Sequence, residues 1–243
     1  MKNELYQRHL ALENSYNIRD IGGYATLDGC STRWKTLLRA DSPNSLTSAE
    51  QRQLLDYPVR TIIDLRRNAE LQRAPAIFAN SQAVRYVNIS LLEEERKVRG
   101  VQTLAALYCQ ILETCQEQMQ QVLQFMASGG IFPCMVHCTI GKDRTGLIIA
   151  LLLSICNVPA STIVSDYALS EQYVAPFFDL RRAQLAQDGS DIQSLEWLTT
   201  ALPETMLTTL AYLDERYGSV QAYLRAIGIN DMQMEYLRNS LIE

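Results

Sequence analysis

The sequence contains little histidine, no closely spaced pair of cysteines and no long apolar run. Its histidines are His9 and His137 alone, and its six cysteines, at positions 30, 109, 115, 134, 138 and 156, include no C-x-x-C pair. Structural zinc sites and disulfide frameworks usually show such pairs or ligand clusters. The sequence therefore predicts no metal or other cofactor and no disulfide, and its free thiols favour the cytosol.

The charge pattern gives no indication of a nucleic-acid partner. The 243 residues carry a formal net charge of −5, the isoelectric point is about 5.2, and no block of five or more like charges occurs. Proteins that bind DNA or RNA need clustered cations to neutralise phosphates. We therefore expect no nucleic-acid partner.

The apolar segments are too short for stable membrane insertion. The longest run, residues 147–153, is far below the roughly 20 residues that cross a bilayer. The first 17 residues are polar and lack the apolar core of a signal peptide. We expect a cytoplasmic protein, and we leave open secretion by a route without a signal peptide.

The chain is predicted to form one domain, residues 1–243, because no repeat or Pro/Gly/Ser-rich linker divides it. Its 47% apolar content is sufficient for a sizeable core. Residues 131–136 form a short apolar run, a glycine-bearing loop follows, and residues 147–156 predict an apolar helix. This order is typical of an α/β domain with a central, mostly parallel sheet flanked by helices.

Other segments fit the same architecture. Turn signals in the first forty residues predict small strands or hairpins. Thr47 and Glu50 form a capping-box pattern for a helix through Leu55. Residues 59–65 and 84–89 predict central strands, and residues 101–126 predict one helix. After Pro159 we expect a helical C-terminal third, with helices over residues 161–173, 203–217, 220–227 and 232–242.

Residues 137–146, HCTIGKDRTG, lie between the predicted strand and helix. The five residues Thr139, Ile140, Gly141, Lys142 and Asp143 can curl so that their backbone N–H groups point inward, and the helix adds its positive end. Such a ring binds a phosphate dianion. Arg144 can then bind two phosphate oxygens with its planar fork.

Cys138 lies in the same electrostatic field, which favours its nucleophilic thiolate form. Thr145 can donate its hydroxyl proton to the sulfur, and His137 can help to hold the cysteine backbone or simply pack in the core. Attack of the sulfur on phosphorus would form a phosphocysteine, and an acid would have to protonate the leaving oxygen.

This loop resembles the signature of cysteine-dependent protein tyrosine phosphatases, and its K-D-R-T-G ending resembles the atypical bacterial tyrosine and lipid phosphatases. Residues 17–24 (NIRDIGGY) are similar to the N-F-R-D-x-G-G element of that family, with Ile18 in place of Phe. Residues 63–66 with Glu70 resemble D-L-R-x-x-x-E, and residues 216–224 resemble R-Y-G-S-x-x-x-Y-L. The resemblance implies a protein tyrosine phosphatase-like fold and hydrolysis of phosphomonoesters without metal.

The acid has two candidates, because no W-P-D sequence, the usual source of this group, is present. Asp143 lies inside the predicted ring, and Asp64 lies at a strand end that the sheet could aim at the same site. We favour Asp143 as the catalytic acid. Asp64 then remains a substrate-binding candidate or a cap of its loop, and Asp143 could instead pair with Lys142 or Arg19.

Substrate class stays open between a phosphorylated protein and a phosphoinositide. Lys142 could be a further cation near phosphotyrosine, or it could bind a neighbouring phosphate of an inositol ring. Arg19, Arg66 and Arg67 could extend a positive rim, although single arginines are more often paired or solvated.

The aromatic residues Tyr167, Tyr173, Phe177 and Phe178 lie where the resemblance implies helices that cover the active site, and packing in the core explains them equally well.

The predicted function is hydrolysis of phosphotyrosine through a phosphocysteine. Phosphoinositide or dual-specificity hydrolysis is the alternative, and a non-catalytic phosphate-binding module is a remote one because both Cys138 and Arg144 are present. A rhodanese-like sulfurtransferase also places a cysteine before a helix, but the Arg-Thr-Gly ending of the loop argues against it.

Overall fold

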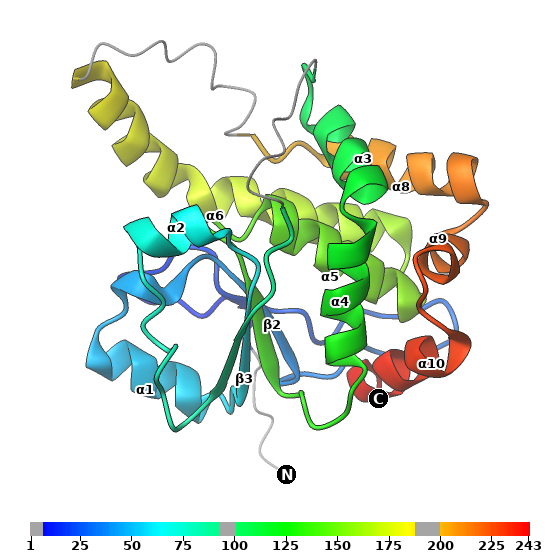
Figure 1. Cartoon of the computed structure of the whole chain (residues 1–243), viewed down its shortest axis with the longest axis horizontal. Helices are drawn as coiled ribbons and strands as arrows, with labels where there is room; N and C mark the ends of the chain where they lie inside the picture. Colours follow the sequence, from blue (N-terminus) through cyan, green and yellow to red (C-terminus); the bar gives the residue numbers. More distant parts are fainter. Residues whose placement is uncertain (1–6, 93–100, 188–199) are drawn as a thin grey trace.

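A five-stranded sheet forms the centre of the computed structural model, which describes residues 7–92, 101–187 and 200–243 (Figure 1). The strand order is β1-β2-β5-β3-β4. The first pair is antiparallel and the other neighbours are parallel. The strands are β1 (Arg19–Asp20), β2 (Leu37–Ala40), β3 (Thr61–Asp64), β4 (Arg85–Asn88) and β5 (Cys134–His137). The predicted mostly parallel α/β sheet is confirmed.

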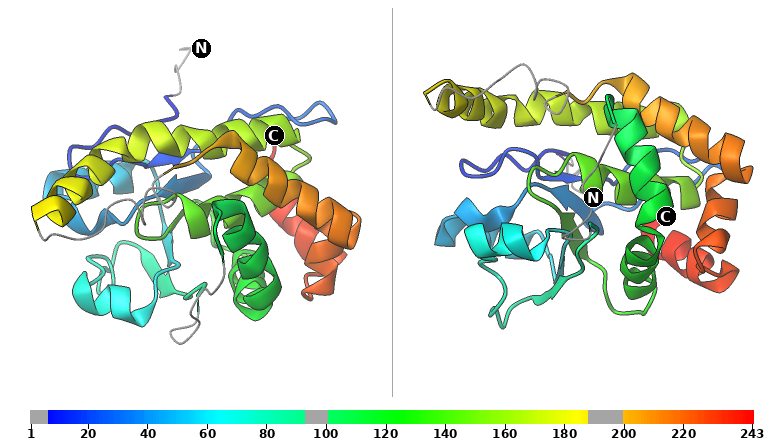
Figure 2. Two further views of the ribbon diagram at one scale, coloured as in Figure 1. Left: turned by 90° about the horizontal axis from the view of Figure 1, so that it is seen from above. Right: turned by 45° about the horizontal axis from the view of Figure 1, so that its top comes forward.

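Helices cover both faces of the sheet, and α6 and α8 lie side by side along one side of the molecule (Figures 1 and 2). A 3-10 turn, Pro43–Ser45, follows β2. The helices of the described residues are α1 (Ser48–Asp56), α2 (Asn68–Arg73), α3 (Leu104–Thr114), α4 (Gln116–Met126), α5 (Asp143–Ile155), α6 (Ala160–Gln187), α8 (Pro203–Tyr217), α9 (Val220–Ala226) and α10 (Asp231–Leu241). The expected helical C-terminal third is therefore present.

Alternating side chains of the central strands build two separate cores, because successive residues of a strand point to opposite faces. The smaller core lies on the side of α1 and contains Leu38, Ile62 and Met135. The larger core lies against the helices from α3 to α10 and contains Leu37, Ile63 and Val136. Arg39 lies two residues after Leu37 in β2, so its charged side chain points to the same face of the sheet, toward the larger core.

The carboxyl ends of β2, β5 and β3 meet at one edge of the sheet. Ala40 and Asp64 are both in register with His137, the last residue of β5. The loop that follows β5 therefore emerges between the segments that follow β2 and β3. In parallel sheets this edge is where ligands usually bind.

Three predicted helices have other bounds in the structure. The single helix expected over residues 101–126 is divided at Cys115, whose φ of −116° and ψ of 34° are not helical. The apolar helix predicted from residue 147 begins at Asp143, and α6 continues past Tyr173 through Pro176. Pro176 therefore lies inside a continuous helix, although an interior proline usually ends or kinks one. In the described part of the chain, no helix combines the length and apolar character needed to cross a bilayer.

Truncation of Leu152 should destabilise the protein strongly. This residue of α5 is fully buried in the larger core, and a Leu→Ala change in a core removes packing contacts and leaves a cavity. We expect Leu152→Ala to lower the free energy of unfolding by about 2–5 kcal/mol in urea titrations. The matched control, Leu207→Ala, changes a leucine of α8 that is 54% exposed, and should change it by less than about 0.5 kcal/mol. Equal losses would contradict this placement of the core.

Candidate active site

The Cys138 loop, residues 138–142, connects β5 to α5 and is held from outside through its carbonyl groups. Four consecutive oxygens each accept a hydrogen bond: Cys138 O from His137 Nδ1 (3.1 Å), Thr139 O from Ser42 N (3.0 Å), Ile140 O from Asn17 Nδ2 (2.9 Å) and Gly141 O from Arg39 Nη2 (2.8 Å). In a trans peptide the N–H points opposite to the C=O. The N–H groups of residues 139–142 therefore face away from these donors, as the predicted ring requires.

Gly141 allows the loop to pass close to the end of β2. Its φ is +69°, a left-handed conformation that side chains with a Cβ rarely adopt. A Cβ at this position would lie 2.5 Å from the backbone C and O of Ala40. Backbone atoms of a strand cannot move aside easily, so this position requires glycine for both reasons.

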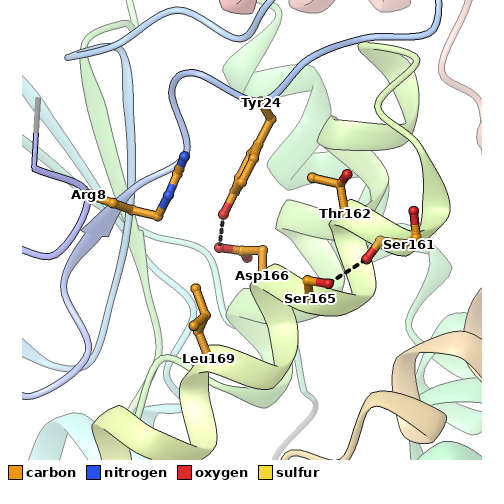
Figure 3. A pocket seen from close by; sticks show the side chains of 7 residues that line it. All are labelled: Arg8, Tyr24, Ser161, Thr162, Ser165, Asp166 and Leu169. Carbon is orange, nitrogen blue, oxygen red and sulfur yellow. Dashed lines mark hydrogen bonds between the residues drawn. The ribbon is translucent and has the colours of Figure 1, made fainter.

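A separate pocket of about 270 Å³ opens beside the start of α6 (Figure 3). Its lining residues are Arg8, Tyr24, Ser161, Thr162, Ser165, Asp166 and Leu169. None of them belongs to the Cys138 loop. This pocket is therefore not the phosphate ring that the sequence predicts.

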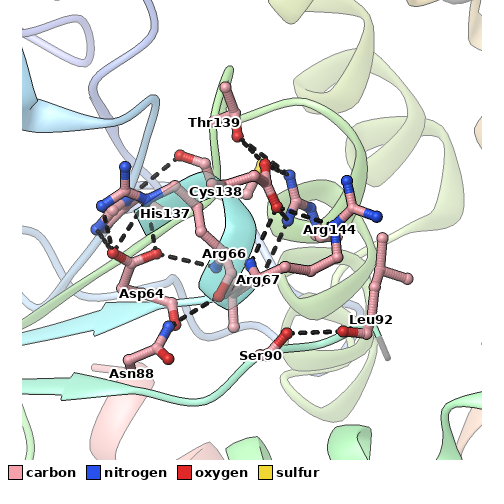
Figure 4. A network of polar contacts seen from close by, with 12 residues as sticks. Asp64, Arg66, Arg67, Asn88, Ser90, Leu92, His137, Cys138, Thr139 and Arg144 are labelled. Atoms are coloured by element: carbon pink, nitrogen blue, oxygen red, sulfur yellow. Dashed lines mark hydrogen bonds and ion pairs between the residues drawn. The ribbon is translucent and has the colours of Figure 1, made fainter. Parts of the chain in front are cut away.

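Arg144 lies beside the Cys138 loop in a bidentate pair with Glu70 (Figure 4). Its Nη1 and Nη2 donate to the two carboxylate oxygens of Glu70 at 2.7 Å each, and Nη2 also lies 3.2 Å from Thr139 Oγ1. Burial lowers the pKa of Arg144, but electrostatic interactions with Cys138 and Glu70 and the hydrogen bonds to Glu70 outweigh this effect and raise it. The guanidinium is therefore fixed, charged and close to the predicted nucleophile.

Asp143 and Lys142 contact each other at the start of α5. Lys142 Nζ lies 3.4 Å from Asp143 Oδ1 and donates to Thr200 O at 2.8 Å. Tyr108 donates its hydroxyl proton to Asp143 Oδ1 at 2.5 Å. Burial and the charge of Asp143 raise the pKa of Tyr108 well above its usual value, so this tyrosine stays protonated. The Asp143 side chain remains 26% exposed, which leaves its carboxyl group accessible at the rim of the loop.

A family model described as "Tyrosine phosphatase family" matches residues 10–243. The chain belongs to this family. Members of this family are phosphoric monoester hydrolases of the tyrosine phosphatase class, and so is this protein. The resemblance to cysteine-dependent tyrosine phosphatases that the sequence motifs indicated is confirmed. The sulfurtransferase alternative is wrong.

Similar proteins carry related names. The chain is 31% identical over 211 residues to a tyrosine-protein phosphatase of Nostoc commune, covering 79% of this chain and 69% of that protein. It is 29% identical over 139 residues to the triple specificity protein phosphatase PtpB of Mycobacterium tuberculosis, covering 52% of this chain and 49% of that protein. The crystal structure of P. aeruginosa TpbA shares 17% identity, with coverage of 70% and 89% and a TM-score of 0.32. That score is too low to support a conclusion about fold.

In this phosphatase, Asp64 is a buried partner of its own loop. Its carboxylate accepts from Arg66 Nε and Nη2 and from the Tyr86 hydroxyl, and it lies 3.5 Å from His137 Nε2. Burial raises its pKa, but the charge of His137 and the hydrogen bonds from Arg66 outweigh this and lower it below its usual value. Asp64 is 0% exposed. The Asp143 side chain is thus partly exposed beside the Cys138 loop, whereas the Asp64 side chain is enclosed by its own partners.

The arginines expected to form a positive rim are paired instead. Arg19 is buried and binds Asp166, Arg66 binds Asp64, and Arg67 lies 3.3 Å from Glu70 Oε2. A buried guanidinium without a counter-charge would be very costly, which explains why Arg19 and Arg66 bind carboxylates. The Arg67 side chain is 37% exposed, so its pair with Glu70 lies nearer the surface. The simpler interpretation of these arginines, that they are paired, is the one the structure supports.

Of the two side chains that could contact Cys138, His137 and Thr145, only His137 forms a hydrogen bond with it. His137 donates to Cys138 O, so it holds the cysteine backbone as expected. Burial lowers the pKa of His137, and the nearby Asp64 carboxylate only partly offsets this. The hydroxyl of Thr145 is buried without a hydrogen-bond partner among the described residues, so the expected donation to the sulfur is not formed.

The four aromatic residues of α6, Tyr167, Tyr173, Phe177 and Phe178, do not share one environment. Tyr167 is buried, and its hydroxyl lies 2.8 Å from that of Tyr108. The Tyr173 ring stacks on His9 with centroids 4.1 Å apart. Phe178 lies 5.8 Å from Lys142 Nζ, and its ring also contacts that of Phe177. Tyr167 thus belongs to the core, while Phe178 is close to the Cys138 loop.

Sequence reasoning did not assign a site role to Asn17, Arg39, Glu70 or Tyr108. Asn17 and Glu70 lie within stretches that resemble family elements, so their presence there was a usable signal. Arg39 is a charged residue inside the otherwise apolar strand LLRA, which also could have drawn attention. Tyr108 gave no signal, because its bond to Asp143 joins residues 35 positions apart.

Substitution of Gly141 by alanine should have two effects: strain from the positive φ, and a clash of the added Cβ with Ala40 that displaces the Cys138 loop. Gly130 has a φ of +66° with no atom within 4 Å of an added Cβ, so Gly130→Ala is a matched control. Both variants should lose roughly 1–2 kcal/mol of stability from the positive φ. Only Gly141→Ala should also lower turnover of p-nitrophenyl phosphate, by about 10²-fold, because the clash with Ala40 displaces the loop. Similar turnover in the two variants would contradict this role.

Proposed function

We propose that the protein hydrolyses phosphotyrosine in protein substrates through a phosphocysteine on Cys138. The observation that supports this most is the pairing of all four carbonyls from Cys138 to Gly141 with donors outside the loop, which turns the N–H groups of residues 139–142 away from those donors. Preorganised N–H groups of this kind stabilise a phosphate dianion and the charge that develops in the transition state.

Arg144 completes the binding of the phosphoryl group. The substrate dianion would take hydrogen bonds from the loop and from the guanidinium, which Glu70 and Thr139 keep close to the loop in the absence of substrate. Burial raises the pKa of Glu70, but the bonds and charge of Arg144 hold it well below its usual value. Glu70 thus stays ionised, orients Arg144 and is unsuited to act as the acid.

The reaction proceeds in two steps, formation of the phosphocysteine and its hydrolysis. The Cys138 thiolate attacks phosphorus, the bond from phosphorus to the tyrosine oxygen breaks, and Asp143 gives its proton to that oxygen. The Asp143 carboxylate then accepts a proton from water, which attacks the phosphocysteine and releases inorganic phosphate and the thiolate. Splitting the hydrolysis in this way replaces one difficult displacement with two easier ones. No metal takes part in these steps.

A phosphotyrosine substrate fits the environment of Lys142 better than an inositol phosphate does. Lys142 is fully buried and binds Thr200 O and Asp143, so it is committed to contacts within the protein. The alternative is dual-specificity or phosphoinositide hydrolysis; the name of the mycobacterial relative, a triple specificity protein phosphatase, favours a specificity broader than phosphotyrosine. A panel of phosphotyrosine, phosphoserine and phosphoinositide substrates separates these possibilities.

Replacement of Cys138 tests the nucleophile. Cys138→Ser should abolish turnover of phosphotyrosine peptides, because a serine hydroxyl in this field is not ionised at neutral pH. It should still bind inorganic phosphate, since the N–H groups and Arg144 remain; calorimetry measures this binding. Residual turnover above about 1% of the wild-type rate would disprove the assignment, because loss of a covalent nucleophile normally costs far more than 10²-fold.

Replacement of Asp143 tests the acid. Asp143→Asn should lower kcat by roughly 10²–10⁴ for a poor leaving group such as tyrosine and much less for dinitrophenyl phosphate, which needs little proton assistance. Asp64→Asn is the contrast: it should lower stability without dependence on the leaving group. If Asp64→Asn shows that dependence while Asp143→Asn slows both substrates equally, the two roles are exchanged.

A further inference from the structure

Two buried side chains hold the middle of the Cys138 loop from behind. Asn17 donates from Nδ2 to Ile140 O at 2.9 Å, and Arg39 donates from Nη2 to Gly141 O at 2.8 Å. They come from positions 123 and 102 residues away in the sequence. Asn17 is 0% and Arg39 is 1% exposed. Neither side chain can therefore reach a bound substrate.

These two bonds control the direction of two N–H groups of the loop. The peptide plane that carries Ile140 O also carries the N–H of Gly141, and the plane of Gly141 O carries the N–H of Lys142. Gly141 has no Cβ to restrict its backbone, so the planes on either side of it can rotate more easily than others. External hydrogen bonds at these two carbonyls hold both N–H groups toward the phosphate side.

Helix α6 holds both donors in place. Arg19 donates to Asn17 Oδ1 and, through Nε, to Asp166 Oδ1 at 3.1 Å. Arg39 Nη1 donates to Asp166 Oδ2 at 2.6 Å. One turn further along α6, Ser170 Oγ lies 3.0 Å from Arg19 Nη2 and 3.3 Å from Arg39 Nη2. We call these five residues the backing network.

Charge keeps the backing network intact at neutral pH. Burial raises the pKa of Asp166, but the charges of Arg19 and Arg39 outweigh this and hold it below its usual range. Burial lowers the pKa of Arg19 only to about 10. Tyr24 adds a further bond to Asp166 Oδ1 at 2.9 Å (Figure 3). The network is therefore built on the ion pairs of Arg19 and Arg39 with Asp166, to which the neutral Asn17 and Ser170 are hydrogen-bonded.

We propose that Asn17 and Arg39 are positioning residues that aim the phosphate-binding N–H groups of the Cys138 loop, and that Asp166 and Ser170 of α6 keep them in register. The inference rests on the proposed function, because it assigns these residues to phosphate binding at that loop. It also implies that α6 contributes to the site through the back of the loop.

The test uses two variants that separate geometry from charge. Arg39→Lys keeps a buried positive charge, but a single ammonium group cannot reproduce the planar fork that spans Asp166 and Gly141 O. Asn17→Ala removes one neutral donor and changes no charge. We expect each to raise the inhibition constant of orthovanadate, which fills the phosphate site, by roughly 10–100-fold, and to lower kcat for phosphotyrosine peptides similarly.

A distant residue provides the control for stability. Tyr223 is 0% exposed and donates its hydroxyl proton to a backbone carbonyl, Leu112 O, at 2.9 Å. Tyr223→Phe therefore removes a comparable buried bond outside the backing network. It should lower the melting temperature while leaving the vanadate constant within twofold of wild type. If Arg39→Lys does not fold, Ser170→Ala replaces it and should weaken vanadate binding in the same direction by a smaller factor.

The outcomes distinguish this inference from the proposed function. Wild-type protein that neither hydrolyses p-nitrophenyl phosphate nor binds vanadate would overturn the proposed function and the inference together. Wild-type protein that does both, with Asn17→Ala and Arg39→Lys binding vanadate within twofold of it, would overturn the inference alone. Weaker vanadate binding in both variants but not in Tyr223→Phe is the expected result.

Discussion

The geometry of the site depends on hydrogen bonds that hold the Cys138 loop from outside. A run of N–H groups aimed at one point is unfavourable in isolation, because the aligned dipoles repel and the carbonyls on the other side need partners. Here those partners come from His137 of β5, Ser42 after β2, Arg39 of β2 and Asn17 before β1. The loop keeps its shape because the surrounding fold satisfies its carbonyl groups.

The charged groups around the loop follow the same requirement for partners. Arg144 pairs with Glu70, Lys142 with Asp143, and Arg66 with Asp64. Each buried cation thus has a carboxylate within 3.4 Å, which limits the cost of desolvation. The positive field that attracts a phosphate therefore comes mainly from backbone N–H groups, the N-terminus of α5 and the orientation of Arg144. Arg19, Arg66 and Arg67 do not supply it, because each of them is paired with a carboxylate.

The main elements of the fold could be predicted because they depend on local patterns. The capping box of Thr47 and Glu50 forms as expected, and the apolar runs around residues 59–65 and 84–89 contain β3 and β4. The division between α3 and α4 at Cys115 and the continuation of α6 through Pro176 could not be predicted. Tertiary context routinely overrides local helix propensity, and the periodicity of one segment carries no information about that context.

The sequence by itself determined the Cys138 loop, the placement of Arg144 after it and the identity of the family, because these residues are contiguous and their spacing specifies the chemistry. Only the tertiary structure showed the partners of the two aspartates: Asp64 accepts hydrogen bonds from Arg66 and Tyr86, and Asp143 accepts one from Tyr108. It alone also brought Asn17 and Arg39 to the back of the loop. The physical reason is that hydrogen bonds act over about 3 Å in space, whereas a sequence records only separation along the chain.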